Sequence, residues 1–104
     1  RKHSMNSKLD GMLGIAAKAG KIVFGSEMSV DAIRHKKAQL VILALDASDR
    51  TKKLVRNKSG SFGAELVEYG TIEHLGKILG KTRVSCVAVC DKGIAAAMMK
   101  ILWG

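Results

Sequence analysis

Aromatic side chains are scarce in this sequence, at 4% of the residues. The four aromatic residues, Phe24, Phe62, Tyr69 and Trp103, are scattered along the chain. Many proteins that bind single-stranded nucleic acid stack the bases on several aromatic rings. The scarcity of such rings therefore argues against base recognition by stacking.

Cysteine is also rare, and the two cysteines, Cys86 and Cys90, lie in one apolar run. In a strand both side chains would lie on the same face, too far apart along the strand to form a disulfide easily. Their neighbours are apolar and would not lower the pKa of a thiol. We expect reduced, structural thiols and a cytoplasmic protein.

The sequence has no uninterrupted apolar run of about eighteen residues, and its N-terminus lacks the apolar core of a signal peptide. We therefore expect no membrane association. The tetrapeptide Arg1-Lys2-His3-Ser4 precedes Met5, and we interpret residues 1–4 as a remnant of the expression vector. A length of 104 residues and a hydrophobic content of 47% predict a single globular domain over residues 5–104.

Acidic residues are half as numerous as basic ones, nine against eighteen, which gives a net charge of +9 and a pI near 9.9. Without residues 1–4 the net charge is still +7, because Arg1 and Lys2 account for two of the positive charges. Such an excess indicates a polyanionic partner rather than a small neutral substrate. Charge alone does not distinguish RNA, DNA and anionic lipid.

Motifs that carry chemistry are also missing. A P-loop needs Gly, four residues and then Gly-Lys-Ser/Thr, but in residues 76–82 the spacing is one residue short and Leu75 stands where glycine should be. His35 and His74 are far apart in the sequence, have no metal-ligand spacing and are interpreted as surface residues. We predict no metal, no cofactor and no enzymatic activity.

Hydrophobic periodicity predicts helices that alternate with strands. The expected helices cover about residues 6–19, 26–37, 48–58, 71–80 and 93–101, and the expected strands cover 21–24, 40–45, 64–69 and 84–90. The strands at 40–45 and 84–90 show no polar alternation, which is typical of strands covered on both faces. Residues 59–63 are expected to form a loop. The pattern predicts the α/β class, as a three-layer α-β-α sandwich with a small mixed sheet.

The stretch around Gly25 is the first candidate for a binding site. Gly25 permits a sharp turn after a strand, and Ser26 is expected to cap the helix that follows. Exposed N–H groups and the positive end of the helix dipole suit a phosphate or an electron-rich base edge. The alternative is a helix cap with no binding role.

A second candidate is the helix that follows residue 48. It carries five basic residues and no acid among them: Arg50, Lys52, Lys53, Arg56 and Lys58. Two interpretations stay open. The helix either presents an ordinary solvated face or follows a nucleic-acid backbone.

Three segments of the sequence, at residues 25–27, 38–48 and 75–80, together resemble the ribosomal kink-turn-binding family. This is the L7Ae and L30e group, which includes small bacterial YlxQ-type members, and the resemblance extends over residues 5–103. It implies an α-β-α sandwich that binds ribosomal or other structured RNA without catalysis, as part of the ribosome or translation machinery. Proteins of that machinery are further possible partners.

The resemblance also implies which residues contact RNA. These lie in the turn, along the following helix and in the loop before the last strand: Gly25, Ser26, Glu27, Met28, Arg34, Lys81, Thr82 and Arg83. Met28 stands where the family often has an amide or an acid, and Asp31 where it often has lysine. We therefore expect weaker kink-turn binding than in members with that lysine. The alternative is a protein-interaction adaptor on the same fold with degenerate kink-turn specificity.

Overall fold

The computed structural model describes residues 2, 3 and 5–104. Arg1 and Ser4, which belong to the interpreted vector remnant at residues 1–4, lie outside the described residues. The elements follow one another as β1 (Lys2–His3), α1 (Ser7–Lys18), β2 (Ile22–Phe24), α2 (Ser26–Arg34), β3 (Leu40–Leu43), α3 (Asp49–Phe62), β4 (Leu66–Tyr69), α4 (Ile72–Leu79), β5 (Cys86–Val89) and α5 (Lys92–Trp103). None of the described helices is long and apolar enough to span a membrane.

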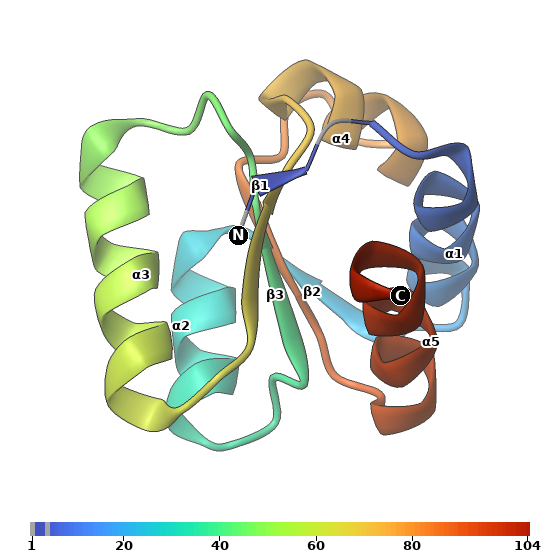
Figure 1. Cartoon of the computed structure of the whole chain (residues 1–104). Coiled ribbons are helices and arrows are strands. Elements are labelled where there is room, and N and C mark those ends of the chain that lie inside the picture. The colour runs from blue at the N-terminus through green and yellow to red at the C-terminus, as the bar shows by residue number, and fades with distance from the viewer. Residues whose placement is uncertain (1, 4) are drawn as a thin grey trace.

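The strands form one mixed sheet in the order β1-β4-β3-β5-β2. Neighbouring strands β1, β4 and β3 run parallel, whereas β5 is antiparallel to both β3 and β2. Helices α2 and α3 cover one face of this sheet, and α1, α4 and α5 cover the other (Figure 1). The predicted α-β-α sandwich with a small mixed sheet is confirmed.

The two strands without polar alternation lie inside the sheet, as predicted. All four residues of β3 and all four of β5 are buried. Ile42 in β3 pairs with Val67 of β4 on one side and with Val87 of β5 on the other. Both strands end a residue or two short of the predicted 40–45 and 84–90, but their place in the core is that expected from the sequence.

The predicted loop at residues 59–63 is wrong, because α3 continues through Phe62. Ser59 is buried against the rest of the protein, and Gly63 ends the helix in the left-handed conformation with φ 69°. Packing of Ser59 and Phe62 and a left-handed cap accompany the longer helix, despite the poor helix propensity of Gly60.

A polar network joins α1 to β4 and α4. The buried Tyr69 hydroxyl donates to Asp10 Oδ1 at 2.5 Å and accepts from the Asn6 N–H at 2.8 Å. His74 Nε2 lies 2.8 Å from the second carboxylate oxygen of Asp10. His74 is therefore half-buried and partnered, and its interpretation as a surface residue is wrong, whereas His35 is exposed as expected.

This network predicts a high-pH transition that the single tyrosine of the sequence can report. Burial, followed by the hydrogen bond to Asp10, raises the pKa of Tyr69 from 10.0 to about 12. Folding thus favours the neutral phenol, and its contribution to stability is complete below pH 10.0 and lost between there and pH 12. Titration by tyrosinate absorbance should give a pKa near 12 in the folded protein and near 10 after denaturation. A folded-state value near 10 would contradict the buried network.

Both cysteines are free, in agreement with the prediction of reduced thiols. Burial raises the pKa of the Cys86 thiol to about 11, and a hydrogen bond with Ser29 lowers it by a smaller amount. Burial also raises the pKa of Cys90, and the positive charge of Lys37 partly offsets this increase. Because the thiolate is the reactive form, both side chains are suited to packing rather than redox chemistry.

Candidate nucleic-acid interface

The turn after β2 is built on Gly25. Its backbone has φ 90° and ψ 161°, a conformation that residues with a Cβ rarely adopt. The Gly25 N–H donates to the Cys86 carbonyl at 2.8 Å, and the Gly25 carbonyl accepts from the Ser29 N–H at 3.0 Å. These two bonds fix the turn between β5 and the first turn of α2.

The N-terminus of α2 has no side-chain cap. Gly25 is the N-cap residue, and Ser26 is already the first residue of the helix, so the prediction that Ser26 caps it is wrong. A side chain within the first helical turn is not in the N-cap position from which a hydroxyl reaches the following N–H groups. The first N–H groups of α2 therefore remain available to an outside acceptor.

The residues that follow Gly25 face solvent to different extents. Ser26 is half-buried, and Glu27 and Met28 are exposed. Met28 exposes 54% of its surface, as single apolar side chains on protein surfaces commonly do. Asp31 is exposed one turn further on, and its carboxylate Oδ1 lies 3.4 Å from His35 Nδ1.

The loop before β5 lies beside this turn. Gly80 ends α4 in the left-handed conformation with φ 70°, and Lys81, Thr82 and Arg83 are exposed. The Lys81 amine sits 4.8 Å from the centre of the Phe24 ring, a cation–π contact next to Gly25. The fold thus brings together two segments that the sequence separates by more than fifty residues.

Gly76 lets the loop pack closely on α4. A Cβ at this position would lie 2.7 Å from the carbonyl oxygen of Thr82 and 2.9 Å from that of Lys81. The Gly76 carbonyl also accepts the Lys81 N–H at 2.8 Å. The position of the basic loop therefore depends on a glycine in α4, a relation that no local pattern in the sequence reveals.

Arg34 does not share this edge of the molecule. It is exposed in the last turn of α2, eight residues from Ser26. At 1.5 Å per residue, that is about 12 Å along the helix axis. Of the eight residues expected to contact RNA, the fold gathers seven around the Gly25 turn and the loop, and places Arg34 at the other end of α2.

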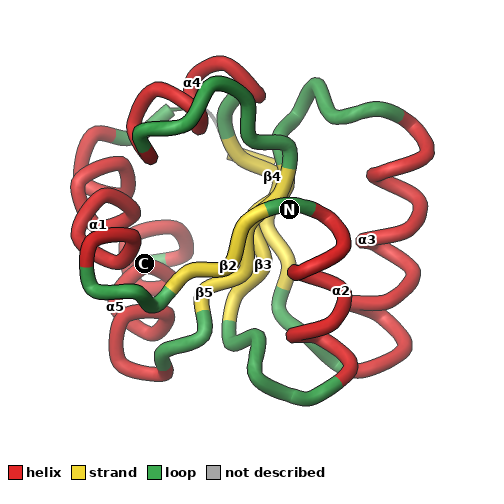
Figure 2. The backbone as a smooth tube through the Cα atoms, turned by 180° about the vertical axis from the view of Figure 1, so that it is seen from behind, coloured by secondary structure: helices red, strands yellow, loops and turns green. Residues whose placement is uncertain are grey.

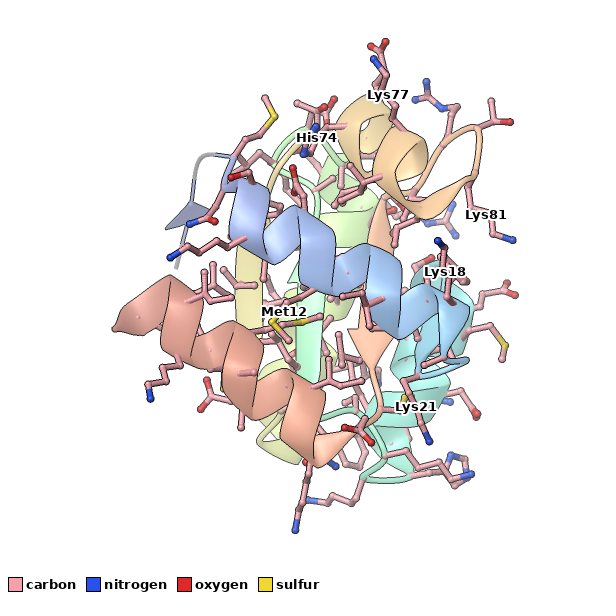
Figure 3. The ribbon with its side chains drawn as sticks, turned by 90° about the vertical axis from the view of Figure 1, so that its right-hand side faces the viewer. Met12, Lys18, Lys21, His74, Lys77 and Lys81 are labelled. Atoms are coloured by element: carbon pink, nitrogen blue, oxygen red, sulfur yellow. The ribbon has the colours of Figure 1, made fainter. Side chains whose placement is uncertain are left out.

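Charges of both signs surround the turn. Glu27 and Asp31 on α2 oppose the approach of phosphate, whereas Lys81 and Arg83 favour it. Figure 3 shows Lys18 and Lys21 on the same side of the view as Lys81. Neither lysine was predicted as a site residue, because a lone lysine carries no sequence pattern.

The site offers hydrogen-bond donors and positive charge. Among the described residues, no group of three or more His, Cys, Asp or Glu side chains is placed to hold a metal ion. The backbone N–H groups of α2, the Thr82 hydroxyl and the amines suit an anionic or base-edge ligand. A small mixed-sheet sandwich that presents a glycine turn and a basic loop at one edge is a domain suited to binding nucleic acid.

A comparison with protein families is consistent with a nucleic-acid-binding domain. A model of the ribosomal protein L7Ae/L30e/S12e/Gadd45 family matches residues 7–99. The match covers most of the domain, from the first residue of α1 to the last turns of α5. The chain belongs to this family.

Curated relatives extend over nearly the whole chain. An RNA-binding protein YlxQ of Enterococcus faecium is 32% identical over 97 residues, covering 93% of each chain. The RNA-binding protein YlxQ of Bacillus subtilis is 34% identical over 91 residues, covering 88% of this chain and 91% of that protein. A large ribosomal subunit protein eL30 of Methanosarcina mazei is 32% identical over 91 residues, covering 86% of this chain and 84% of that protein.

Solved structures share the fold. A Bacillus halodurans protein described as having unknown function superposes with a TM-score of 0.88 at 31% identity, over 93% of this chain and 98% of that one. A 15.5kD RNA binding protein of Giardia lamblia superposes with a TM-score of 0.76 at 19% identity, over 93% of this chain and 89% of that one. At that identity the second likeness concerns the fold alone.

Proposed function

We propose that this protein binds structured, kink-turn-like RNA of the ribosome or translation machinery and performs no catalysis. The observation that carries the proposal is the 4.8 Å contact between the Lys81 amine and the Phe24 ring, which joins the basic loop to the Gly25 turn. The names of the relatives support it, since two are RNA-binding proteins and one is a ribosomal protein. None of those names favours the alternative of a protein-interaction adaptor.

In this proposal the turn supplies the geometry of the site. The absence of a Cβ at Gly25 allows a base edge or phosphate to approach the backbone closely. The free N–H groups at the start of α2 donate to it, and the Ser26 hydroxyl adds a donor or acceptor. The Glu27 carboxylate can accept from an exocyclic amine of a base, but it repels phosphate.

The basic loop supplies the second contact. The Arg83 guanidinium can hold a phosphate, or the edge of a guanine, through two parallel hydrogen bonds. Lys81 adds a point charge beside the turn, and the Thr82 hydroxyl adds a neutral donor. Since aromatic rings are few, recognition depends on hydrogen bonds and charge rather than stacking.

We further propose that the partner is ribosomal or other structured RNA in the cytoplasm, with proteins of the translation machinery as possible neighbours. The mechanism needs no cofactor, because every step is binding.

Two substitutions test the site. Asp31→Lys changes the local charge by +2, and we expect tighter binding of a kink-turn RNA with a steeper salt dependence. Arg83→Ala should weaken binding by roughly 1 kcal/mol or more, about five-fold, because a cationic contact is lost. Affinities measured over a range of salt concentrations check both expectations, after thermal melts have shown that the variants fold.

Matched variants separate local contacts from general charge effects. Glu73→Lys makes the same charge change in the first turn of α4, outside helix α2 and the Gly25 turn, and should matter less than Asp31→Lys. Arg34→Ala removes one cation from the far end of α2 and should matter less than Arg83→Ala. If the protein binds RNA but Asp31→Lys and Arg83→Ala leave affinity and salt dependence unchanged, the site lies elsewhere.

A further inference from the structure

Helix α3 carries several basic side chains that form no ion pair with the described residues. The helix holds five basic residues and one acid, Asp49 in its first turn. Arg56 belongs to the structure of the domain, because its guanidinium donates to both carboxylate oxygens of the buried Glu68 at 2.8 Å. Within the described part of the chain, no acidic group forms an ion pair with the other four: Arg50, Lys52, Lys53 and Lys58.

The helical spacing gathers two of these side chains, together with Asn57, into a ridge. Arg50, Lys53 and Asn57 follow one another at intervals of three and four residues, so they lie on one face of α3. All three are exposed, whereas Val55 is buried on the opposite face. Two shallow hollows follow the ridge, one lined by Arg50, Lys53, Leu54, Asn57 and Lys58, the other by Asp49, Arg50, Lys52, Lys53, Arg56 and Asn57.

Contacts at both ends of α3 hold the ridge in place. At the N-terminus the Ser48 hydroxyl accepts the Thr51 N–H at 3.2 Å. At the C-terminus the Lys36 amine donates to the Phe62 carbonyl at 3.0 Å, and Gly63 closes the helix. The charged face is therefore presented by an anchored helix rather than by a flexible segment.

The ridge lies on the same side of the sheet as the Gly25 turn. Helices α2 and α3 cover one face side by side, and both views of the chain show them as neighbours (Figures 1 and 2). Packed helices are separated by about 8–10 Å between axes. An RNA held at the start of α2 that continues across this helix would therefore meet α3.

We propose that the outer face of α3, formed by Arg50, Lys53 and Asn57 with the half-buried Lys58 beside them, is a second RNA contact that holds the phosphate backbone of a duplex flanking the bound motif. The proposal rests on the proposed function, since it assumes an RNA partner. The chemistry is that of backbone contact: amines and a guanidinium neutralise phosphates without reading the sequence. An ordinary solvated face remains the competing interpretation.

A triple variant, Arg50→Gln with Lys53→Gln and Lys58→Gln, removes three charges from this face and spares the Arg56 ion pair. The matched control, Lys8→Gln with Lys92→Gln and Lys100→Gln, removes three charges from α1 and α5 on the other face of the sheet. Both are compared with the wild-type protein on a kink-turn RNA with long flanking stems. The same RNA with its stems shortened is measured in parallel.

On the long RNA, the α3 variant should lose on the order of ten-fold in affinity, and the slope of log affinity against log salt should become shallower by about 2–3, because each phosphate contact contributes roughly 0.9 to that slope. The control should change the slope by less than about 1. Shortening the stems should reduce the difference between the two variants. If the triple variant does not fold, the three single variants carry the same comparison.

Equal losses in the two triple variants, with binding by the wild type, would overturn the α3 contact and leave the proposed function standing. If the wild type bound neither RNA at low salt, both proposals would fail. A polyglutamate peptide serves as a competing polyanion. If it bound as tightly as the long RNA and was equally sensitive to the α3 variant, the assignment of this face to RNA would be wrong.

Discussion

Replacing Ile42 with alanine is expected to lower the free energy of unfolding by about 2–5 kcal/mol. Ile42 is fully buried in β3 and lies between Val67 of β4 and Val87 of β5. Helices cover the sheet on both faces, so the smaller side chain leaves a cavity that solvent does not reach. Urea denaturation of the wild type and the variant measures the loss directly.

The exposed Ile15 on α1 provides a matched control, because the same substitution there removes the same atoms. Ile15 exposes 65% of its surface, and Ile15→Ala should change stability by no more than about 0.5 kcal/mol. A loss below half a kcal/mol for Ile42→Ala would place Ile42 outside the core and contradict the architecture.

The second large effect is expected from Gly76→Ala. The new Cβ would lie 2.7 Å from the Thr82 carbonyl oxygen and 3.0 Å from the Thr82 carbonyl carbon. Both are backbone atoms, so the loop must move away from α4. Forcing a group into so tight a contact typically costs about 1–3 kcal/mol. We expect lower stability in urea together with weaker RNA binding, because Lys81 and Arg83 move with the loop.

Gly11→Ala in α1 has the opposite expectation and serves as the control. A Cβ at Gly11 meets nothing within 4 Å. Alanine is a better helix former than glycine by about 0.8–1 kcal/mol, so this variant should be stabilised. If Gly76→Ala were also stabilising, the close contact between α4 and the loop would not exist in solution.

The core of this fold could be predicted because its signal is local. The runs at β3 and β5 are apolar at every position, which identifies strands buried on both faces wherever the rest of the chain lies. The glycines at positions 63 and 80 adopt left-handed conformations at helix ends. The end of the helix at position 80 was predicted, whereas the continuation of α3 to Phe62, before Gly63, was not.

The site was less predictable, because its contacts connect distant parts of the sequence. The resemblance to a family supplied the turn and the loop, but not the Phe24 ring that receives Lys81, nor the close approach of Thr82 to Gly76. His74 looked like a surface residue because its partner, Asp10, is 64 positions away. The predicted N-cap, Ser26, is one residue after the observed N-cap, Gly25. Rules for helix boundaries are not accurate to a single residue.

The hydrogen bond from the Gly25 N–H to the Cys86 carbonyl has a consequence for the energetics of binding. It attaches the turn to β5, the strand into which the basic loop leads. Both contact segments are thereby fixed to the buried sheet before a partner arrives. Association then loses little conformational entropy on the protein side. More of the contact free energy is left for affinity than in a site whose loops must first become ordered.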